Sequence, residues 1–326
     1  MTGFFIALAR ILTAGVLLGL AGPAAAQQGY PNKPIRLITP FAPGGGTSII
    51  GNLIGQKLSE SWGQQVLVDH RPGGNTIIGS EALVRSPPDG YTIMLQAGGH
   101  AVHLSLQTLP YDTVKDFAPV TTVTSSAYIL VLHPSVPANN LQEIIALAKS
   151  KPGKLNFASA GSGGLPHMAG ELFQILAGVK FLHVPYKGSG PAITDLLAGQ
   201  VDLSFQDPLN VVARIKGGKL KSIAISGDAR LPVLPQLPTF TEAGLPGMDV
   251  KNWYGVFAPA RTPKEIINKL WTELARIMGM PDIREKLASQ GVEPFITTPD
   301  QFVALINADI AKYAGIIKAA NIKLEH

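Results

Sequence analysis

The chain has 326 residues, a length that favours two domains over one of ordinary size. Hydrophobic residues make up 46% and charged residues 15%, a globular composition that excludes a disordered chain. The absence of cysteine excludes disulfides, thiolate zinc sites, iron–sulfur clusters and cysteine nucleophiles. The net charge of +5 is spread along the chain without Lys/Arg clusters, so we expect no nucleic-acid partner.

Both ends of the chain are predicted to lie outside the fold. Arg10 precedes an apolar run at 11–20, and a row of alanines ends at Ala26, which predicts a secretory signal peptide at 1–26 cleaved after Ala26. The alternative, an uncleaved anchor, would need roughly 20 apolar residues to span a bilayer. Export of a chain without cysteine indicates a bacterial periplasm. Residues 324–326 resemble the remnant of an expression tag.

The first part of the chain alternates between short apolar strands and helices. Strands are predicted at 35–41, 66–68 and 91–95, and helices at 47–62 and 76–84. A glycine turn at 43–46 separates the first strand from the first helix. Successive units of this kind are typical of a largely parallel sheet that is covered by helices.

The alternation restarts after a polar stretch at 109–119. Strands are predicted at 128–132, 155–158, 181–184, 201–205 and 220–225, and helices at 141–149, 166–176 and 191–197. A proline-rich loop at 231–238 leads to a strand at 253–257 and to helices at 263–278, 282–289 and 299–320. Thr262 and Thr298 each precede a proline, a pattern that predicts a capping hydroxyl. The fold class is therefore α/β, with two lobes, a cleft between them and a helical C-terminal segment.

Two glycine-rich loops, one in each lobe, are predicted to bind an anion. The first contains Gly44, Gly45, Gly46, Thr47 and Ser48, and the second contains Ser159, Gly161, Ser162, Gly163 and Gly164, followed by His167. Each loop opens onto the start of a helix, whose free N–H groups and partial positive charge attract an anion. The alternative is a pair of tight turns that only pack helices on sheets. Neither loop matches a phosphate loop, a dinucleotide fingerprint or a nucleophile elbow.

Three further loops supply weaker candidates. Lys187 offers a positive charge, or is simply a solvated lysine, and Gln206 and Asp207 follow a strand directly, where Asp207 has the alternative role of a helix cap. Gly98 lies at the end of a strand in the first lobe. His100 and His103 lack a nearby acid, so we expect no metal site. We also expect no cofactor and no catalytic residue, since no triad, metal motif or carboxylate pair is present.

Nine short segments, taken in order, resemble the tripartite tricarboxylate transporter substrate-binding proteins, also called Bug receptors. They are YPNKPIR (30–36), PFAPGGGT (40–47), RPGG (71–74), PDGYT (88–92), LPYD (109–112), KDF (115–117), HVPYKG (183–188), AGLPG (243–247) and WYG (253–255). Each segment is weak evidence alone. The ordered set extends from about residue 30 to 323 and is specific for this family.

The resemblance implies a two-lobed periplasmic binding protein of type II-like fold that closes on an organic carboxylate. We expect a discontinuous first domain, 27–125 with 240–323, and a second domain at 126–239. The receptor would be a monomer that delivers its ligand to a membrane permease with one large and one small subunit, driven by an ion gradient. In the family the two glycine loops hold the carboxylate, and these are carried over to 44–48 and 159–164.

Two segments depart from the family pattern. Ser48 stands where Asp is usual, and Gln206, Asp207 and Pro208 replace Asp-Asn-Leu. Fewer acids argue against an amino-acid ligand and favour a di- or tricarboxylate, or an aromatic carboxylate such as terephthalate. Two alternatives from other classes stay open: an exported hydrolase or lyase that acts on a small carboxylate, and a ligand sensor for a signalling partner.

Overall fold

The computed structural model describes residues 29–320 and 322. The predicted signal peptide and the predicted tag remnant lie outside the described residues. Residues 29–32 belong to a separate unit, and the chain from Lys33 onward forms the unit that carries both sheets. In the described part of the chain, no helix combines the length and the apolar character needed to cross a bilayer.

The first sheet has six strands in the order β11-β4-β10-β3-β1-β2. Their bounds are β1 Ile35–Thr39, β2 Val66–His70, β3 Thr92–Ala97, β4 Phe117–Ala127, β10 Lys251–Pro259 and β11 Glu293–Pro294. Strand β1 runs parallel to β2 and β3, whereas β10 is antiparallel to β3 and β4. Helices α2 (Gly46–Trp62), α3 (Ile77–Val84) and α4 (His100–His103) follow β1, β2 and β3.

The prediction of a largely parallel first sheet is wrong, because β4 and β10 make it mixed. Strand β4 begins within the stretch that the sequence indicated as polar. The buried hydroxyls of Thr121 and Thr122 have partners: Thr121 Oγ1 donates to the carbonyl of Thr297 at 2.8 Å, and Thr122 Oγ1 donates to that of Phe295 at 2.6 Å. A strand can carry buried threonines when each hydroxyl has such a partner.

The second sheet has five strands in the order β7-β6-β8-β5-β9. Their bounds are β5 Ile129–Leu132, β6 Asn156–Ser159, β7 Leu182–Pro185, β8 Leu203–Gln206 and β9 Lys221–Ile225. Strand β6 is parallel to β7 and β8, and β5 is antiparallel to β8 and β9. Helices α5 (Leu141–Ser150), α6 (Leu165–Ala177) and α7 (Ser189–Leu197) match the prediction, and α8 (Pro208–Lys216) is additional.

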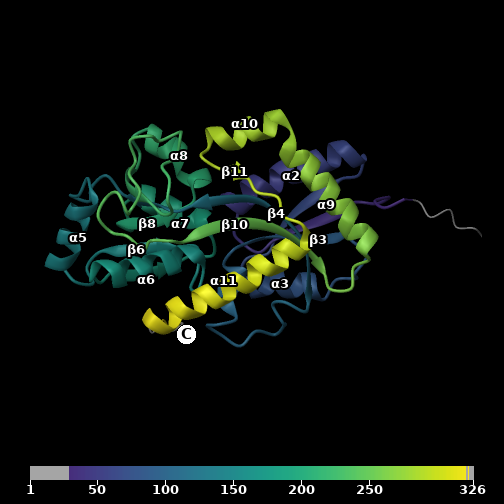
Figure 1. Cartoon of the computed structure of the whole chain (residues 1–326), viewed down its shortest axis with the longest axis horizontal. Coiled ribbons are helices and arrows are strands. Elements are labelled where there is room, and N and C mark those ends of the chain that lie inside the picture. The colour runs from purple at the N-terminus through teal and green to yellow at the C-terminus, as the bar shows by residue number, and fades with distance from the viewer. Residues whose placement is uncertain (1–28, 321, 323–326) are drawn as a thin grey trace, which may run out of the picture. The chain divides into compact units, whose positions relative to one another are not determined.

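Three helices form the C-terminal segment: α9 (Lys264–Gly279), α10 (Pro281–Ser289) and α11 (Pro299–Ala320). Figure 1 shows α11 running beside β10 toward α6. Near its end, Tyr313 and Ile317 join the hydrophobic core that α6 and the second sheet share. Phe240 and Val250 belong to the same core. The exact division of the chain into a discontinuous first lobe and a second lobe stays a prediction.

The two predicted hydroxyl caps have different outcomes. Thr298 confirms the prediction, since its Oγ1 accepts from the Gln301 amide at 3.3 Å and its own amide donates to Gln301 Oε1 at 2.9 Å. Thr262 does not cap α9, because its hydroxyl donates to the carbonyl of Pro259 at 2.7 Å and Pro263 occupies the cap position. The reciprocal pair at Thr298 is a capping box.

Thr298→Ala is expected to lower the free energy of unfolding by about 1 kcal/mol, because the Gln301 amide at the start of α11 loses its acceptor. Urea denaturation followed by circular dichroism measures this change. Thr298→Ser, which keeps the hydroxyl, is the matched control. Equal stability of the alanine and serine variants would contradict the capping role.

Candidate functional site

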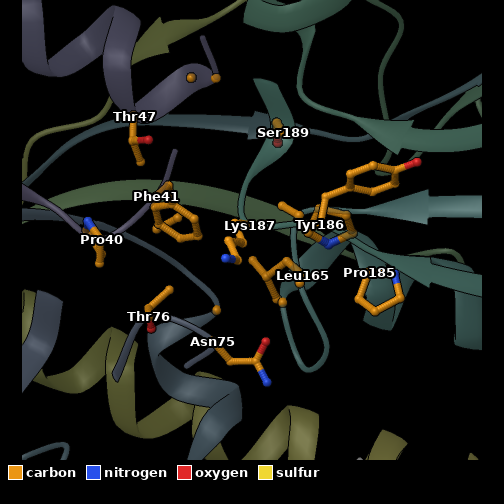
Figure 2. Close-up of a pocket in the computed structure, with 18 of the residues that line it drawn as sticks. Pro40, Phe41, Thr47, Asn75, Thr76, Leu165, Pro185, Tyr186, Lys187 and Ser189 are labelled. Atoms are coloured by element: carbon orange, nitrogen blue, oxygen red, sulfur yellow. The ribbon is translucent and has the colours of Figure 1, made fainter. Parts of the chain in front are cut away.

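A cavity of about 360 Å³ lies where the loops of the first sheet face those of the second. Most of its wall comes from the carboxyl ends of parallel strands, the place where α/β folds bind ligands. The loops after β1, β2 and β3 contribute from the first sheet, and the loops after β6, β7 and β8 from the second. Strand β10 supplies a further part of the wall through Asn252 and Tyr254. Figure 2 shows side chains from both sides converging on this space.

The first glycine loop presents the start of α2 to the cavity. Gly45, Gly46 and Thr47 line the cavity, whereas Gly44 and Ser48 lie outside its lining. Ser48 Oγ accepts from the Gly44 amide at 3.1 Å, so it shapes the loop from behind. The first turn of α2 contains no acid. The first amides of a helix have no partner within it, so this end is open to an anion.

Gly46 has to be glycine because of a close neighbour across the loop. A Cβ at this position would lie 2.0 Å from the hydroxyl oxygen of Tyr254. The phenol of Tyr254 therefore sits against the start of α2, and both line the same cavity. Burial raises the pKa of Tyr254 well above its ordinary value, so the hydroxyl stays protonated.

The second glycine loop faces the first across the cavity. Gly161, Ser162 and Gly164 line the cavity, and Gly164 is the N-cap of α6, whose first turn also lacks an acid. Ser159, Gly163 and His167 lie outside the lining. Ser159 Oγ accepts from the Gly161 amide at 3.2 Å, and His167 Nδ1 accepts from the Gly163 amide at 3.0 Å. These contacts hold the loop from behind.

Two stacked histidines support this loop. The rings of His167 and His183 are parallel within 10° and their centroids are 3.9 Å apart. His183 Nε2 lies 2.6 Å from Ser159 Oγ, and the ring of Phe157 stacks on His183 at 4.7 Å. Burial, with a contribution from His167, lowers the pKa of His183 to about 3. His183 is therefore neutral at pH 7 and positions Ser159 in the loop.

The loop after β7 brings a positive charge to the cavity. Figure 2 shows Lys187 between Phe41 and Leu165. Ser189, the first residue of α7, lines the cavity close by, and this helix has no acid in its first turn. The ring of Tyr186 also lines the cavity, but its hydroxyl points away and donates to Asp195 at 2.7 Å.

Asp207 is a buried acid in the cavity wall. It confirms the alternative role as a helix cap, since its Oδ1 accepts from the Leu209 amide at 3.0 Å at the start of α8. Its Oδ2 accepts from Asn252 Nδ2 at 3.1 Å and from the hydroxyl of Ser126. Burial raises the pKa of Asp207, and the hydrogen bonds, including one from Tyr254, oppose that shift. Asp207 thus ties the second sheet to strands β4 and β10.

Gln206 lies outside the cavity lining. It is fully buried, and its Nε2 donates to Ser204 Oγ at 2.8 Å. Gly98 also lies outside the lining, and a Cβ there would meet a side-chain carbon of Leu165 at 2.7 Å. Its neighbour Gly99 and His103 do line the cavity.

His100 and His103 have structural surroundings. His100 Nε2 lies 3.0 Å from the carbonyl of Thr113, and burial lowers the pKa of both histidines to about 4. Within the described residues, no group of three or more His, Cys, Asp or Glu side chains is placed to hold a metal ion.

Sequence reasoning missed the loop after β2, which contributes residues 73–76 to the cavity. Asn75 and Thr76 both have left-handed backbones, with φ of 49° and 75°. This conformation is strained for a β-branched threonine, and strain of this kind gathers at functional sites. Because β2 is parallel to β1, the carboxyl-end rule would have found this loop. The same rule applies to Phe41, which follows β1, whereas Tyr128 and Tyr254 carry no comparable sequence signal.

The arrangement suits a small anion with an apolar body. Three helices, α2, α6 and α7, begin at the cavity without first-turn acids. Among the described lining residues, Lys187 carries the basic side chain and Asp207 the acidic one. Asp207 already accepts hydrogen bonds from Ser126, Leu209 and Asn252, so little of its acceptor capacity is left for a ligand donor. Phe41 and Leu165 add apolar surface.

Comparison with known proteins decides the family. The model of the tripartite tricarboxylate transporter family receptor, TctC, matches residues 50–322. The chain belongs to this receptor family. Protein BugT of Bordetella pertussis is 36% identical over 310 residues, which cover 94% of this chain and 95% of BugT. The resemblance to Bug receptors is therefore confirmed.

The solved structure of the periplasmic binding protein BugD, 31% identical with a TM-score of 0.87 over 91% of this chain and 100% of its own, confirms the two-lobed fold of a periplasmic binding protein. A Rhodopseudomonas palustris protein whose structure contains adipate is 32% identical with a TM-score of 0.88, covering 90% of this chain and 99% of its own. MatC from Rhodopseudomonas palustris with bound malate is 30% identical with a TM-score of 0.85, covering 88% of this chain and 100% of its own.

Proposed function

We propose that this TctC-family chain is a periplasmic receptor that captures an organic carboxylate without reacting with it. One observation carries the proposal: the starts of α2 and α6, from opposite sheets and without first-turn acids, line one cavity. Amides at a helix start are directional donors to an anion. Removal of water as the lobes close strengthens each such hydrogen bond.

The ligand class follows from the rest of the wall. A carboxylate on the two helix starts leaves Lys187 for a second charge and Phe41 and Leu165 for an apolar body. A dicarboxylate or an aromatic carboxylate such as terephthalate meets these demands, and two relatives contain adipate and malate. Ser48 and Gln206 lie outside the lining and Asp207 lies within it, so the departures from the family pattern disfavour an amino-acid ligand less than the sequence suggested.

The biological role that fits this family is delivery of the ligand to a membrane permease with one large and one small subunit. We place the mature protein in the periplasm as a monomer. A sensor that docks on a signalling partner would use the same cavity.

One feature would favour the alternative of a hydrolase: Ser159 Oγ lies 2.6 Å from His183 Nε2, as in a nucleophile–base pair. Ser159 is fully buried and lies outside the cavity lining, so a substrate in the cavity does not reach its hydroxyl. Ser162 does line the cavity, but the nearby His167 uses Nδ1 on the Gly163 amide. The geometry favours binding over acyl transfer.

Calorimetric titration with adipate, malate, citrate, terephthalate and aspartate tests the proposal, with adipamide as the neutral control. We expect at least one acid to bind, with adipamide at least 100-fold weaker than adipate if adipate is that acid. Mass spectrometry after incubation should recover each acid unchanged. Binding of adipamide as tight as that of adipate, or conversion of an acid, would contradict the proposal.

A further inference from the structure

Two loops from opposite sheets touch each other directly at the edge of the cavity. The amide of Ala42, after β1, donates to the carbonyl of Lys187, after β7, at 2.8 Å. We call residues 42–45 together with 187–190 the loop contact. A Cβ on Gly45 would lie 3.2 Å from Cβ of Ser189, so the two loops are in van der Waals contact here as well.

Gly190 lies at the tightest point of the loop contact. A Cβ on Gly190 would lie 2.1 Å from the carbonyl oxygen of Pro43 and 3.2 Å from the carbonyl carbon of Gly44. Both neighbours are backbone atoms, which cannot swing aside as a flexible side chain can. No residue with a Cβ fits while the loops hold these positions.

The loop contact depends on the distance between the two sheets that carry these loops. Residues 42–45 connect β1 to α2 on the first sheet. Residues 187–190 lead into α7, whose Ala192 and Leu196 are buried in the core of the second sheet. Gly45, Lys187 and Ser189 of this contact also line the cavity. Separation of the loops would therefore open the cavity wall at the start of α2.

We propose that Gly190 is a positioning residue for closure: its missing side chain lets the loops meet, and a single methyl group there holds the lobes apart. The expected consequence, weaker ligand capture, rests on the proposed function. The loop contact itself needs no ligand. Gly190 acts through the spacing of the loops, not through the ligand.

The methyl group acts mainly on the arrangement in which the two loops touch. Gly190 lies in α7 and its φ is outside the left-handed region, so alanine keeps the backbone conformation. One local cost remains, because a residue before proline is disfavoured in the helical region, and Pro191 follows. The double variant Gly190→Ala/Pro191→Ala removes that cost and keeps the methyl group.

A disulfide trap measures the contact without any ligand. The chain has no cysteine, so Gly45→Cys/Ser189→Cys introduces the sole thiols. The Cβ separation of 3.2 Å is close to the roughly 3.5–4.5 Å that a disulfide requires. Oxidation is followed by electrophoresis and intact mass, in backgrounds carrying Gly190→Ala, Gly190→Ala/Pro191→Ala or Gly315→Ala. Gly315→Ala is the control, since nothing lies within 4 Å of a Cβ in that helix.

We expect rapid cross-linking in the double-cysteine protein and in its Gly315→Ala form, and at least tenfold slower cross-linking with either Gly190 variant. Circular dichroism should show the same fold in all four. Equal rates with and without the methyl group, or no disulfide in any background, would overturn the inference. Because no carboxylate is added, a failed ligand screen leaves this result intact, and the two failures are distinguishable.

Discussion

Gly45→Asp is expected to weaken carboxylate binding at least 100-fold while the fold is retained. Gly45 has an extended backbone, with φ −97° and ψ −178°, so any residue can adopt its conformation. The new carboxylate would lie beside the amides of Ser189 and Gly190 at the start of α7 and next to that of Gly46. It would occupy the positive ends of these helices and repel an anionic ligand. Calorimetry with the tightest acid of the panel measures the change.

Gly45→Asn is the matched control because it has the same shape without the charge. We expect Asn to weaken binding far less than Asp, since its side chain adds bulk near Ser189 but no repulsion. Thermal unfolding should differ little between the two variants. Equal losses for Asp and Asn would show that crowding of the loop, and not charge, explains the effect, and would remove the anion site from this loop.

Acid is expected to destabilise the protein steeply below pH 6.5. Three histidines, of which His100 and His103 are buried and His183 is partly buried, are neutral in the folded state, with pKa values lowered to about 4 for His100 and His103 and to about 3 for His183. Their ordinary value is 6.5. Between these values the unfolded chain binds more protons than the folded chain, so stability is full above pH 6.5 and falls as the pH drops toward 4. At pH 5 the loss is roughly 2 kcal/mol for each histidine.

The variant His100→Phe tests whether protonation of these histidines causes the loss of stability in acid. The ring of His100 packs on Phe117 and Phe257, with centroids 4.8 and 4.9 Å away, so phenylalanine preserves the packing. The Thr113 carbonyl loses its partner, which lowers stability at every pH by about 1–3 kcal/mol. The slope of the free energy of unfolding against pH should become shallower by about a third, because one of three similar groups is removed. Urea denaturation from pH 7.5 to 5 measures it, and an unchanged slope would contradict the histidine explanation.

The sequence predicted the alternating elements because strand and helix periods are local properties. The apolar strand at 35–41 and the helix at 47–62 correspond to β1 and α2. Strand β4 was missed because Thr121 and Thr122 look solvent-exposed until their partners at Thr297 and Phe295, far along the chain, are known. Pairing across such a separation carries no local signal.

The functional site, like the fold, has features that could be predicted from the sequence and features that could not. Loops at the carboxyl ends of parallel strands could be predicted, and Gly45, Gly46, Ser162 and Gly164 do line one cavity. The roles of their neighbours could not, because Ser48, Ser159 and His167 turn to the back of each loop. Asn252 and Tyr254 were missed since they share one face of an antiparallel strand, where the carboxyl-end rule does not apply.

A crystal structure of the protein with the tightest acid of the panel tests the central claim most directly. The proposal predicts a carboxylate oxygen at about 2.7–3.2 Å from the first amides of α2, at Gly46 or Thr47, and a second contact from the loop at 161–164. The cavity wall near Lys187 should face the other end of the molecule. An acid bound outside the cavity, or one whose carboxylate points away from both helix starts, would contradict it.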